Sequence, residues 1–154
     1  MVSFRTIFLA AVIALGSGCS FSPTGGNGSE AAARAADVAL DMVGKPYHYG
    51  GNSPGRGFDC SGLVQYSYAQ AGVRLPHGTD ALLRKTRVIS WRDLQPGDLL
   101  FFDQLGKKAS HVGIYVGDNE FVHAPSSGKV VNVAPFSDTY WRKHFSQARR
   151  VDVF

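Results

Sequence analysis

The hydrophobic pattern of the chain changes once along its length, close to Arg87. Before this point apolar residues recur at helical spacing, and after it they form short runs bounded by turn residues. The pattern predicts helices over 30–43, 60–71 and 79–85, and strands over 99–102, 111–116, 120–124, 130–133 and 149–154. Helices that precede antiparallel strands predict an α+β domain, with the N-terminal helices packed on an antiparallel sheet.

The length and composition are those of one globular domain. The chain has 154 residues, of which 44% are apolar and 18% are charged, and this suits a single domain with a buried core. The sequence contains no internal repeat, and beyond its first 19 residues no apolar stretch is long enough to span a membrane. One domain behind an N-terminal leader is therefore expected.

The first 19 residues have the pattern of a secretory leader. A short basic start that includes Arg5 is followed by an apolar run over 6–15 and by "GSGC". This order also resembles a bacterial lipoprotein signal, which predicts lipid on Cys19, with plain secretion as the alternative. The polar segment 20–29 predicts a flexible tether. The expected organisation is a signal peptide over 1–18, a lipidated cysteine and tether over 19–29, and a catalytic domain over 30–154.

The charge of the mature chain argues against a nucleic-acid partner. Loss of residues 1–18 removes one basic residue and no acidic residue, which leaves 15 basic and 12 acidic residues and a net charge of +3. The basic residues are scattered, whereas a nucleic-acid-binding domain gathers them on one face. No nucleic-acid partner is expected.

The two cysteines of the chain have different surroundings. An oxidising compartment normally pairs cysteines, but if Cys19 carries lipid, Cys60 has no partner. Cys60 is then either a small buried hydrophobe or a reactive thiol. It begins the predicted helix 60–71 with Asp59 as N-cap, and the N–H groups at a helix start favour a thiolate. A reactive Cys60 is expected to have a pKa well below 8.5.

A nucleophilic thiol also needs a base and a group that orients this base. His111 is the candidate base and His123 the candidate orienting group. The other three histidines, His48, His77 and His144, are interpreted as surface residues.

The turn of the predicted hairpin decides whether His111 and His123 can meet. A three-residue turn over 117–119 pairs position 113 with 123, so that the two histidines share a face as diagonal neighbours. A two-residue turn places them on opposite faces.

One cysteine and two histidines are also zinc ligands. A structural zinc site uses four ligands and commonly a close pair such as CxxC, and this chain offers one such thiolate. No metal and no other cofactor is therefore expected.

The chain resembles the NlpC/P60 family of cysteine peptidases in four segments that follow the family's order: "FDCSGLVQY", "LQPGDLLFF", "HVGIYVGDNEFVHA" and "YWRKHFSQARRV". The resemblance extends over about 30–151, and the nearest likeness is to the small lipoprotein murein endopeptidases of Gram-negative bacteria, the MepS (Spr) type. The resemblance implies a circularly permuted papain-like α+β fold. It also implies an enzyme that cleaves peptide bonds in peptidoglycan. The implied location is the periplasmic face of the outer membrane, or the soluble periplasm if no lipid is attached.

The same resemblance assigns the catalytic roles. It implies Cys60 as the nucleophile, His111 as the base and His123 as the residue that orients the base. No cofactor takes part, and the implied partners are peptidoglycan peptides and, through Cys19, a membrane.

Three further residues are assigned to the substrate by the resemblance. Tyr47 lies near the oxyanion, and Asp59 and Ser61, which flank the nucleophile, help to recognise an amine of the substrate. The loop between Gly51 and Cys60 is one residue longer than in the nearest relatives, which leaves substrate preference open. Both D-Ala–diaminopimelate and D-Glu–diaminopimelate bonds remain candidates. An acyltransferase or amidase on the same fold and a non-catalytic wall-binding lipoprotein are the alternatives.

Overall fold

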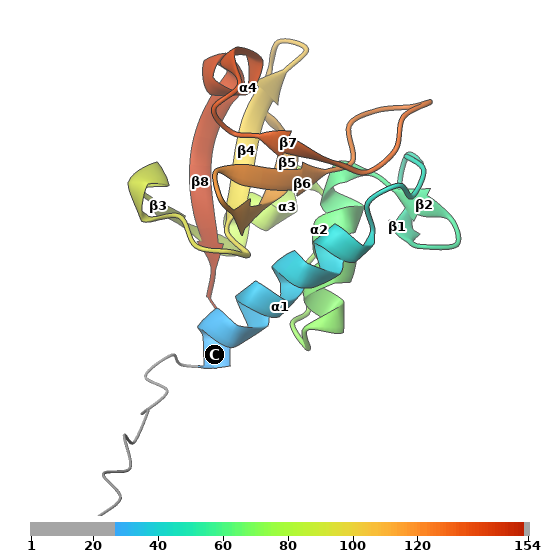
Figure 1. Ribbon diagram of the computed structural model, residues 1–154, viewed down its shortest axis with the longest axis horizontal. Helices are drawn as coiled ribbons and strands as arrows, with labels where there is room; N and C mark the ends of the chain where they lie inside the picture. Colours follow the sequence, from blue (N-terminus) through green and yellow to red (C-terminus); the bar gives the residue numbers. More distant parts are fainter. Residues whose placement is uncertain (1–26, 153–154) are drawn as a thin grey trace, which may run out of the picture.

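The computed structural model describes residues 27–152 and contains a six-stranded antiparallel sheet covered by helices (Figure 1). The helical elements are α1 (Asn27–Asp41), α2 (Cys60–Gln70), α3 (Thr79–Arg84), the 3₁₀ turn η1 (Trp91–Asp93) and α4 (Thr139–His144). The strands are β1 (Asn52–Ser53), β2 (Gly57–Phe58), β3 (Thr86–Ile89), β4 (Leu99–Gln104), β5 (Lys107–Gly117), β6 (Glu120–His123), β7 (Asn132–Pro135) and β8 (Phe145–Val151). The large sheet has the order β3-β8-β4-β5-β6-β7, and β1 pairs only with β2. The predicted α+β class is confirmed.

Helix α1 begins earlier than the sequence pattern predicts. It starts at Asn27 and not at 30, so the last three residues of the predicted tether are helical. Glu30 lies in the first turn, where a carboxylate stabilises the unpaired N–H groups of the helix start. The predicted signal peptide, Cys19 and the rest of the tether lie outside the described residues.

No helix within residues 27–152 has the length and apolar character needed to cross a membrane.

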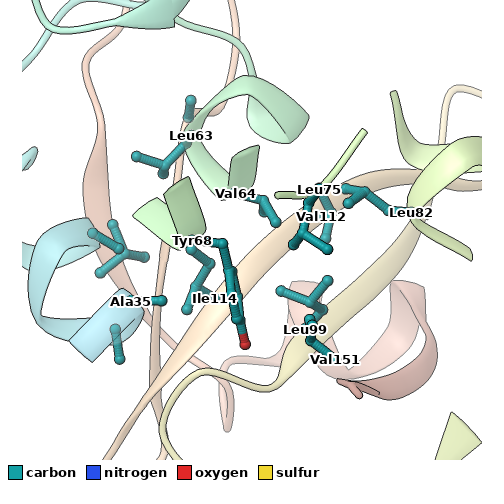
Figure 2. Close-up of a cluster of buried hydrophobic side chains, with 14 of the residues drawn as sticks. Ala35, Leu63, Val64, Tyr68, Leu75, Leu82, Leu99, Val112, Ile114 and Val151 are labelled. Atoms are coloured by element: carbon teal, nitrogen blue, oxygen red, sulfur yellow. The ribbon is translucent and has the colours of Figure 1, made fainter. Parts of the chain in front are cut away.

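Helices α1 and α2 cover one face of the sheet and contribute to the same hydrophobic core. α1 buries four alanines, which let it approach closely: Ala32, Ala35, Ala36 and Ala39. α2 buries Leu63, Val64 and Tyr68 against β4 and β5 (Figure 2). Asp59 caps the start of α2 as predicted, and its carboxylate accepts a hydrogen bond from the N–H of Gly62.

The two faces of the sheet carry two separate cores, because successive side chains of a strand point to opposite sides. Leu99 and Phe101 of β4 pack under α1 and α2, whereas Leu100 and Phe102 point to the other face. On that second face an aromatic cluster packs under Trp141 of α4. The second face therefore carries mainly aromatic residues, and the candidate histidines lie among them.

The hairpin between β5 and β6 differs from the predicted turn but keeps the predicted register. Asp118 and Asn119 form a two-residue turn with positive φ angles of 50° and 61°. The register then shifts by one residue between Tyr115 and Gly117, so that Tyr115 pairs with Phe121. This bulge adds the residue that a three-residue turn would have supplied. The expectation that a two-residue turn separates the histidines is therefore wrong.

Two strands near the C-terminus are shifted from their predicted positions. β7 covers Asn132–Pro135 and not 130–133, because Val131 exchanges backbone hydrogen bonds with Gly44 and Lys45. β8 begins at Phe145 and lies between β3 and β4, so it is an interior strand and not a closing edge.

The sequence pattern missed the shortest elements. The β1–β2 hairpin, β3, η1 and α4 are not among the predicted elements. β1, β2 and η1 have only two or three residues, which is too few to show a hydrophobic period. The omission of α4 matters most because it carries Trp141.

Tyr68 links α2 to the turn before β4. Its ring is fully buried in the main core (Figure 2), and its hydroxyl donates a hydrogen bond to the carbonyl oxygen of Gly97 at 2.7 Å. Gly97 cannot be replaced easily, because a Cβ there would lie 2.3 Å from the carbonyl oxygen of Ala32. The Tyr68 hydroxyl therefore links α2 to the turn before β4, and Gly97 lets this turn lie close to α1.

We expect Tyr68→Phe to lower the free energy of unfolding by about 1–3 kcal/mol, since it leaves a buried carbonyl without its partner. Urea denaturation measures this change. Tyr49→Phe is the matched control, because Tyr49 is 85% exposed and its loss of a hydroxyl should change stability by less than about 0.5 kcal/mol. Equal effects of the two variants would contradict the assigned role of Tyr68.

Candidate active site

Cys60 is the first residue of α2, where the helix start approaches β5. A Cβ at Gly62 would lie 1.9 Å from the carbonyl oxygen of Gly51, so only glycine allows the loop before β1 to press against this turn. The backbone N–H groups of Val112, Ser61 and Cys60 itself interact with the sulfur. Val112 follows His111 directly, and the thiol therefore lies beside the strand that carries the predicted base.

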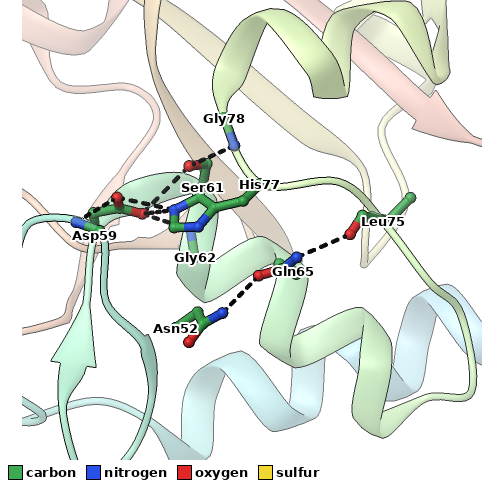
Figure 3. A network of polar contacts seen from close by, with 9 residues as sticks. Asn52, Asp59, Ser61, Gly62, Gln65, Leu75, His77 and Gly78 are labelled. Atoms are coloured by element: carbon green, nitrogen blue, oxygen red, sulfur yellow. Dashed lines mark hydrogen bonds and ion pairs between the residues drawn. The ribbon is translucent and has the colours of Figure 1, made fainter.

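Asp59 is the hub of a hydrogen-bond network that holds this helix start (Figure 3). Its carboxylate accepts hydrogen bonds from the N–H groups of Gly50 and Gly62 and lies 2.8 Å from Nε2 of His77. The Ser61 hydroxyl donates to the same carboxylate and accepts from the N–H of Gly78. His77 is half-buried here and is not a free surface residue, which corrects the sequence interpretation.

The network also bears on the substrate role expected for Asp59 and Ser61. Both side chains face the scaffold that positions Cys60, and Ser61 is buried. Amine recognition by these two residues stays a prediction.

His111 and His123 share one face of the β5–β6 hairpin, as the register predicts. Their side chains are each only 3% exposed, and Nε2 of His111 lies 2.9 Å from Nδ1 of His123. Gly113 makes room for this arrangement, because a Cβ there would lie 2.5 Å from the ring of Phe121.

Asn132 of β7 extends the pair to a third residue. It is the register partner of His123, and its Oδ1 lies 3.1 Å from Nε2 of His123. Its amide nitrogen donates to the carbonyl oxygen of Val130, which assigns the amide orientation. We name His111, His123 and Asn132 the polar relay.

The polar relay selects the tautomer of each imidazole. Because Oδ1 of Asn132 can only accept, Nε2 of His123 carries a proton and Nδ1 of His123 is an acceptor. Nε2 of His111 therefore donates to His123, and Nδ1 of His111 keeps its lone pair. A neutral His111 with a free Nδ1 is the form required of a base.

Trp141 of α4 encloses the polar relay. Its ring stacks on His111 with centroids 5.7 Å apart and meets His123 edge-on at 4.8 Å. Phe102 and Phe121 complete the aromatic enclosure. Apolar rings exclude water from the imidazoles, which strengthens their mutual hydrogen bond.

Burial controls the ionisation of the thiol and the imidazoles. It raises the pKa of Cys60 to about 11, against the opposing effect of the nearby backbone N–H groups. Burial lowers the pKa of His111 to about 3 and that of His123 to about 4. The resting site thus holds a neutral thiol and neutral imidazoles, and the expected low thiol pKa is wrong because desolvation outweighs the helix start.

Tyr47 lies at the edge of the same site. Its backbone forms a bridge to Phe58 of β2, and its N–H donates a hydrogen bond to the carbonyl oxygen of Lys129. Burial, followed by the charge of Cys60, raises the pKa of the Tyr47 phenol. The hydroxyl is protonated at neutral pH and can donate a hydrogen bond beside the thiol.

A metal site is not formed by the described part of the chain. Within residues 27–152 no three histidine, cysteine, aspartate or glutamate side chains converge in a way that could hold a metal ion.

Comparison with known protein families matches residues 44–150 to the NlpC/P60 family. The chain belongs to the NlpC/P60 family. The match covers the helix of Cys60, both histidines and nearly the whole sheet.

Individual relatives agree with this family assignment. The chain is 41% identical to the murein DD-endopeptidase MepH of Escherichia coli over 73% of its own length and 43% of the relative. It is 39% identical to the E. coli protein named murein DD-endopeptidase MepS/murein LD-carboxypeptidase, over 77% of its own length and 62% of the relative. The chain therefore spans less than two thirds of the length of each of these two relatives.

A crystal structure shows the same fold. An NLP/P60 family protein similar to lipoproteins, from Staphylococcus aureus, superposes with a TM-score of 0.69 at 38% identity, over 81% of this chain and 42% of that one. The papain-like NlpC/P60 domain expected from the sequence is thus confirmed at the level of the fold.

The sequence analysis did not identify three residues of the site. Asn132 and Trp141 are distant from the histidines along the chain, and only strand pairing and α4 bring them close. His77 had a weak signal in "LPHGT", a proline-containing segment just before α3. No local pattern reveals that its imidazole reaches Asp59.

The raised thiol pKa predicts how Cys60 reacts with iodoacetamide. Only the thiolate reacts, so labelling of folded protein should be slow at pH 7 and rise about tenfold with each pH unit towards the pKa of about 11. Mass spectrometry of the peptide that contains Cys60 measures the rate without interference from Cys19. Urea-unfolded protein is the control and should titrate near pH 8.5. A labelling rate of folded protein that is already maximal at pH 6 would show that Cys60 is a thiolate at rest. It would contradict the assignment of a neutral thiol and a neutral His111.

Proposed function

We propose that this protein is a cysteine endopeptidase that hydrolyses peptide bonds in the stem peptides or crosslinks of peptidoglycan. The observation that carries the proposal is the polar relay, which leaves Nδ1 of His111 as a free acceptor on the strand beside Cys60. Relatives named murein DD-endopeptidases support the substrate class.

The first step is proton transfer coupled to attack. Nδ1 of His111 accepts the proton of the Cys60 thiol while the sulfur bonds to the scissile carbonyl carbon. The raised pKa of Cys60 reflects the cost of forming a thiolate alone in a site shielded from water. The lowered pKa of His111 reflects the same cost for an imidazolium. The imidazolium and the developing negative charge form together and stabilise each other, so neither has to exist in isolation.

The oxyanion forms next to the start of α2. The backbone N–H of Cys60 donates to it, and the protonated Tyr47 hydroxyl supplies a second donor. Because both donors are held by backbone pairing and by the Asp59 cap, little reorganisation is needed when the charge develops.

The remaining steps return the proton. The His111 imidazolium protonates the leaving amine, and the carbon–nitrogen bond breaks to give a thioester on Cys60. His111 then takes a proton from water, whose oxygen attacks the thioester carbon. The carbon–sulfur bond breaks, the product leaves with a new carboxyl group, and the His111 imidazolium returns its proton to the Cys60 sulfur. His123 and Asn132 keep the ring of His111 in the same orientation in both directions of transfer.

Digestion of purified peptidoglycan tests the proposal. Wild-type protein should release fragments with a new amine and a new carboxylate, detected by mass spectrometry. Cys60→Ser and His111→Ala should each reduce the rate by about 10³-fold or more, because these groups act as a unit. His48→Ala is the matched control, since His48 is exposed, and it should retain the wild-type rate.

Two results would contradict the proposal. Hydrolysis that persists in a folded Cys60→Ser variant would remove the nucleophile. New amide bonds formed with an added amine, in place of free carboxylates, would identify an acyltransferase. Thermal unfolding of each variant separates a loss of chemistry from a loss of fold.

We also propose that the protein is exported and held at the outer membrane by lipid on Cys19. The support is the sequence of the leader, "LGSGC", which lies outside the described residues. Each buried methylene of an acyl chain contributes about 0.8 kcal/mol, so several chains anchor a domain stably.

Fractionation of Gram-negative cells that express the full chain tests this anchor. Wild-type protein should remain with the outer membrane, and Cys19→Ala should appear in the soluble periplasmic fraction with unchanged activity on soluble muropeptides. Wild-type protein found entirely in the soluble fraction would show that "LGSGC" is not used as a lipid signal.

A further inference from the structure

A groove of about 490 Å³ opens beside the polar relay. His123 and Asn132 form part of its wall, so a molecule in the groove lies next to the residues that orient His111. The opposite wall comes from α4, which supplies Tyr140 and the half-buried Trp141. The groove is therefore continuous with the candidate active site.

The lining of this groove has one sign of charge. Among its described lining residues Lys129 is the only ion, and none is an aspartate or glutamate. Ser126, Gln104 and Tyr140 add hydroxyl and amide groups, which can donate hydrogen bonds. Within residues 27–152 the ion pairs do not include Lys129. This donor set is complementary to an anion.

Backbone hydrogen bonds hold Lys129 in place. Its N–H donates to the carbonyl oxygen of Ser126, and its own carbonyl oxygen accepts from the N–H of Tyr47. Lys129 thus lies between the groove and the residue placed near the oxyanion. Its positive charge is close enough to lower the pKa of His123.

The two ends of the site carry charges of opposite sign. Asp59 is the N-cap residue next to Cys60, and Lys129 lines the groove together with His123. A bound peptide that carries a carboxylate is therefore oriented, since its negative group is repelled at the Asp59 end and attracted at the Lys129 end.

We propose that this groove is a subsite for a free carboxylate of the peptidoglycan stem peptide, with Lys129 as its counter-ion and Ser126 as a hydrogen-bond donor. The inference rests on the proposed function and deepens it. Stem peptides carry carboxylates on their D-glutamyl, diaminopimelyl and terminal D-alanyl residues, and conversion to a primary amide removes the charge but keeps the shape. Lys129 is exposed, so a moderate effect that weakens with salt is expected.

A thermodynamic cycle that combines the Lys129→Ala variant of the full-length protein with amidation of the substrate tests the subsite. Soluble muropeptides with all carboxylates free are compared with versions in which each carboxylate in turn is a primary amide. For wild-type protein one of these changes should raise KM by about five- to tenfold with little change in kcat. With the Lys129→Ala variant, the free peptide and the amidated peptide that shows this effect should have equal KM values. The Lys129→Arg variant should restore most of the difference in KM between these two peptides.

The control variant is Lys85→Ala, which removes an exposed lysine at the end of α3 and should keep the full difference between the two peptides. For wild-type protein, the difference in KM between the free and the amidated peptide should also become smaller when the salt concentration is raised about tenfold, from 0.05 to 0.5 M.

Three outcomes are distinguishable. Absence of any hydrolysis that depends on Cys60 would contradict the proposed function itself. Hydrolysis that depends on Cys60 but responds equally to amidation in wild type and Lys129→Ala would overturn the subsite alone. A KM that responds to removal of the sugars and to none of the amidations would assign the groove to glycan stacking on Tyr140, and would also overturn the carboxylate subsite.

Discussion

The pairing of β5, β6 and β7 is the constraint on which the candidate site depends. It brings His111, His123 and Asn132 into one line, although the first and last are 21 positions apart in the printed sequence. A slip of one residue in a strand moves every side chain to the other face. Such a slip between β5 and β6 would break the contact between the two histidines, and a slip of β7 would remove the acceptor that sets both tautomers.

Burial of the two imidazoles has a desolvation cost, and their hydrogen bonds offset this cost. Two imidazoles are almost fully buried under Trp141 and would be unstable there as isolated polar groups. The polar relay satisfies three of their four ring nitrogens and ends on the carbonyl oxygen of Val130. The one ring nitrogen without a hydrogen-bond partner among these contacts is Nδ1 of His111. The same burial raises the pKa of the Cys60 thiol and so favours its neutral form.

Much of the site was predictable because it follows from local periodicity. Asp59 before an apolar helical pattern predicted the cap and placed Cys60 in the first turn, and both are confirmed. The shared face of His111 and His123 was also predicted, yet the turn was wrong. Asp118 and Asn119 adopt positive φ angles and form the shorter turn, and the bulge near Val116 restores the register. The conclusion held because the buried face selects the register, while the turn adjusts to it.

The sequence by itself determined the main helices and strands, the helix start that carries Cys60 and the shared face of the two histidines, since these follow from the local hydrophobic pattern. Only the tertiary structure decided that Asn132 completes the polar relay, that Trp141 covers it and that His77 braces Asp59. It also reversed the expected direction of the thiol pKa. A local pattern shows the helix N–H groups that lower this pKa, but desolvation is set by every segment packed around the sulfur, and that sum exists only in the folded chain.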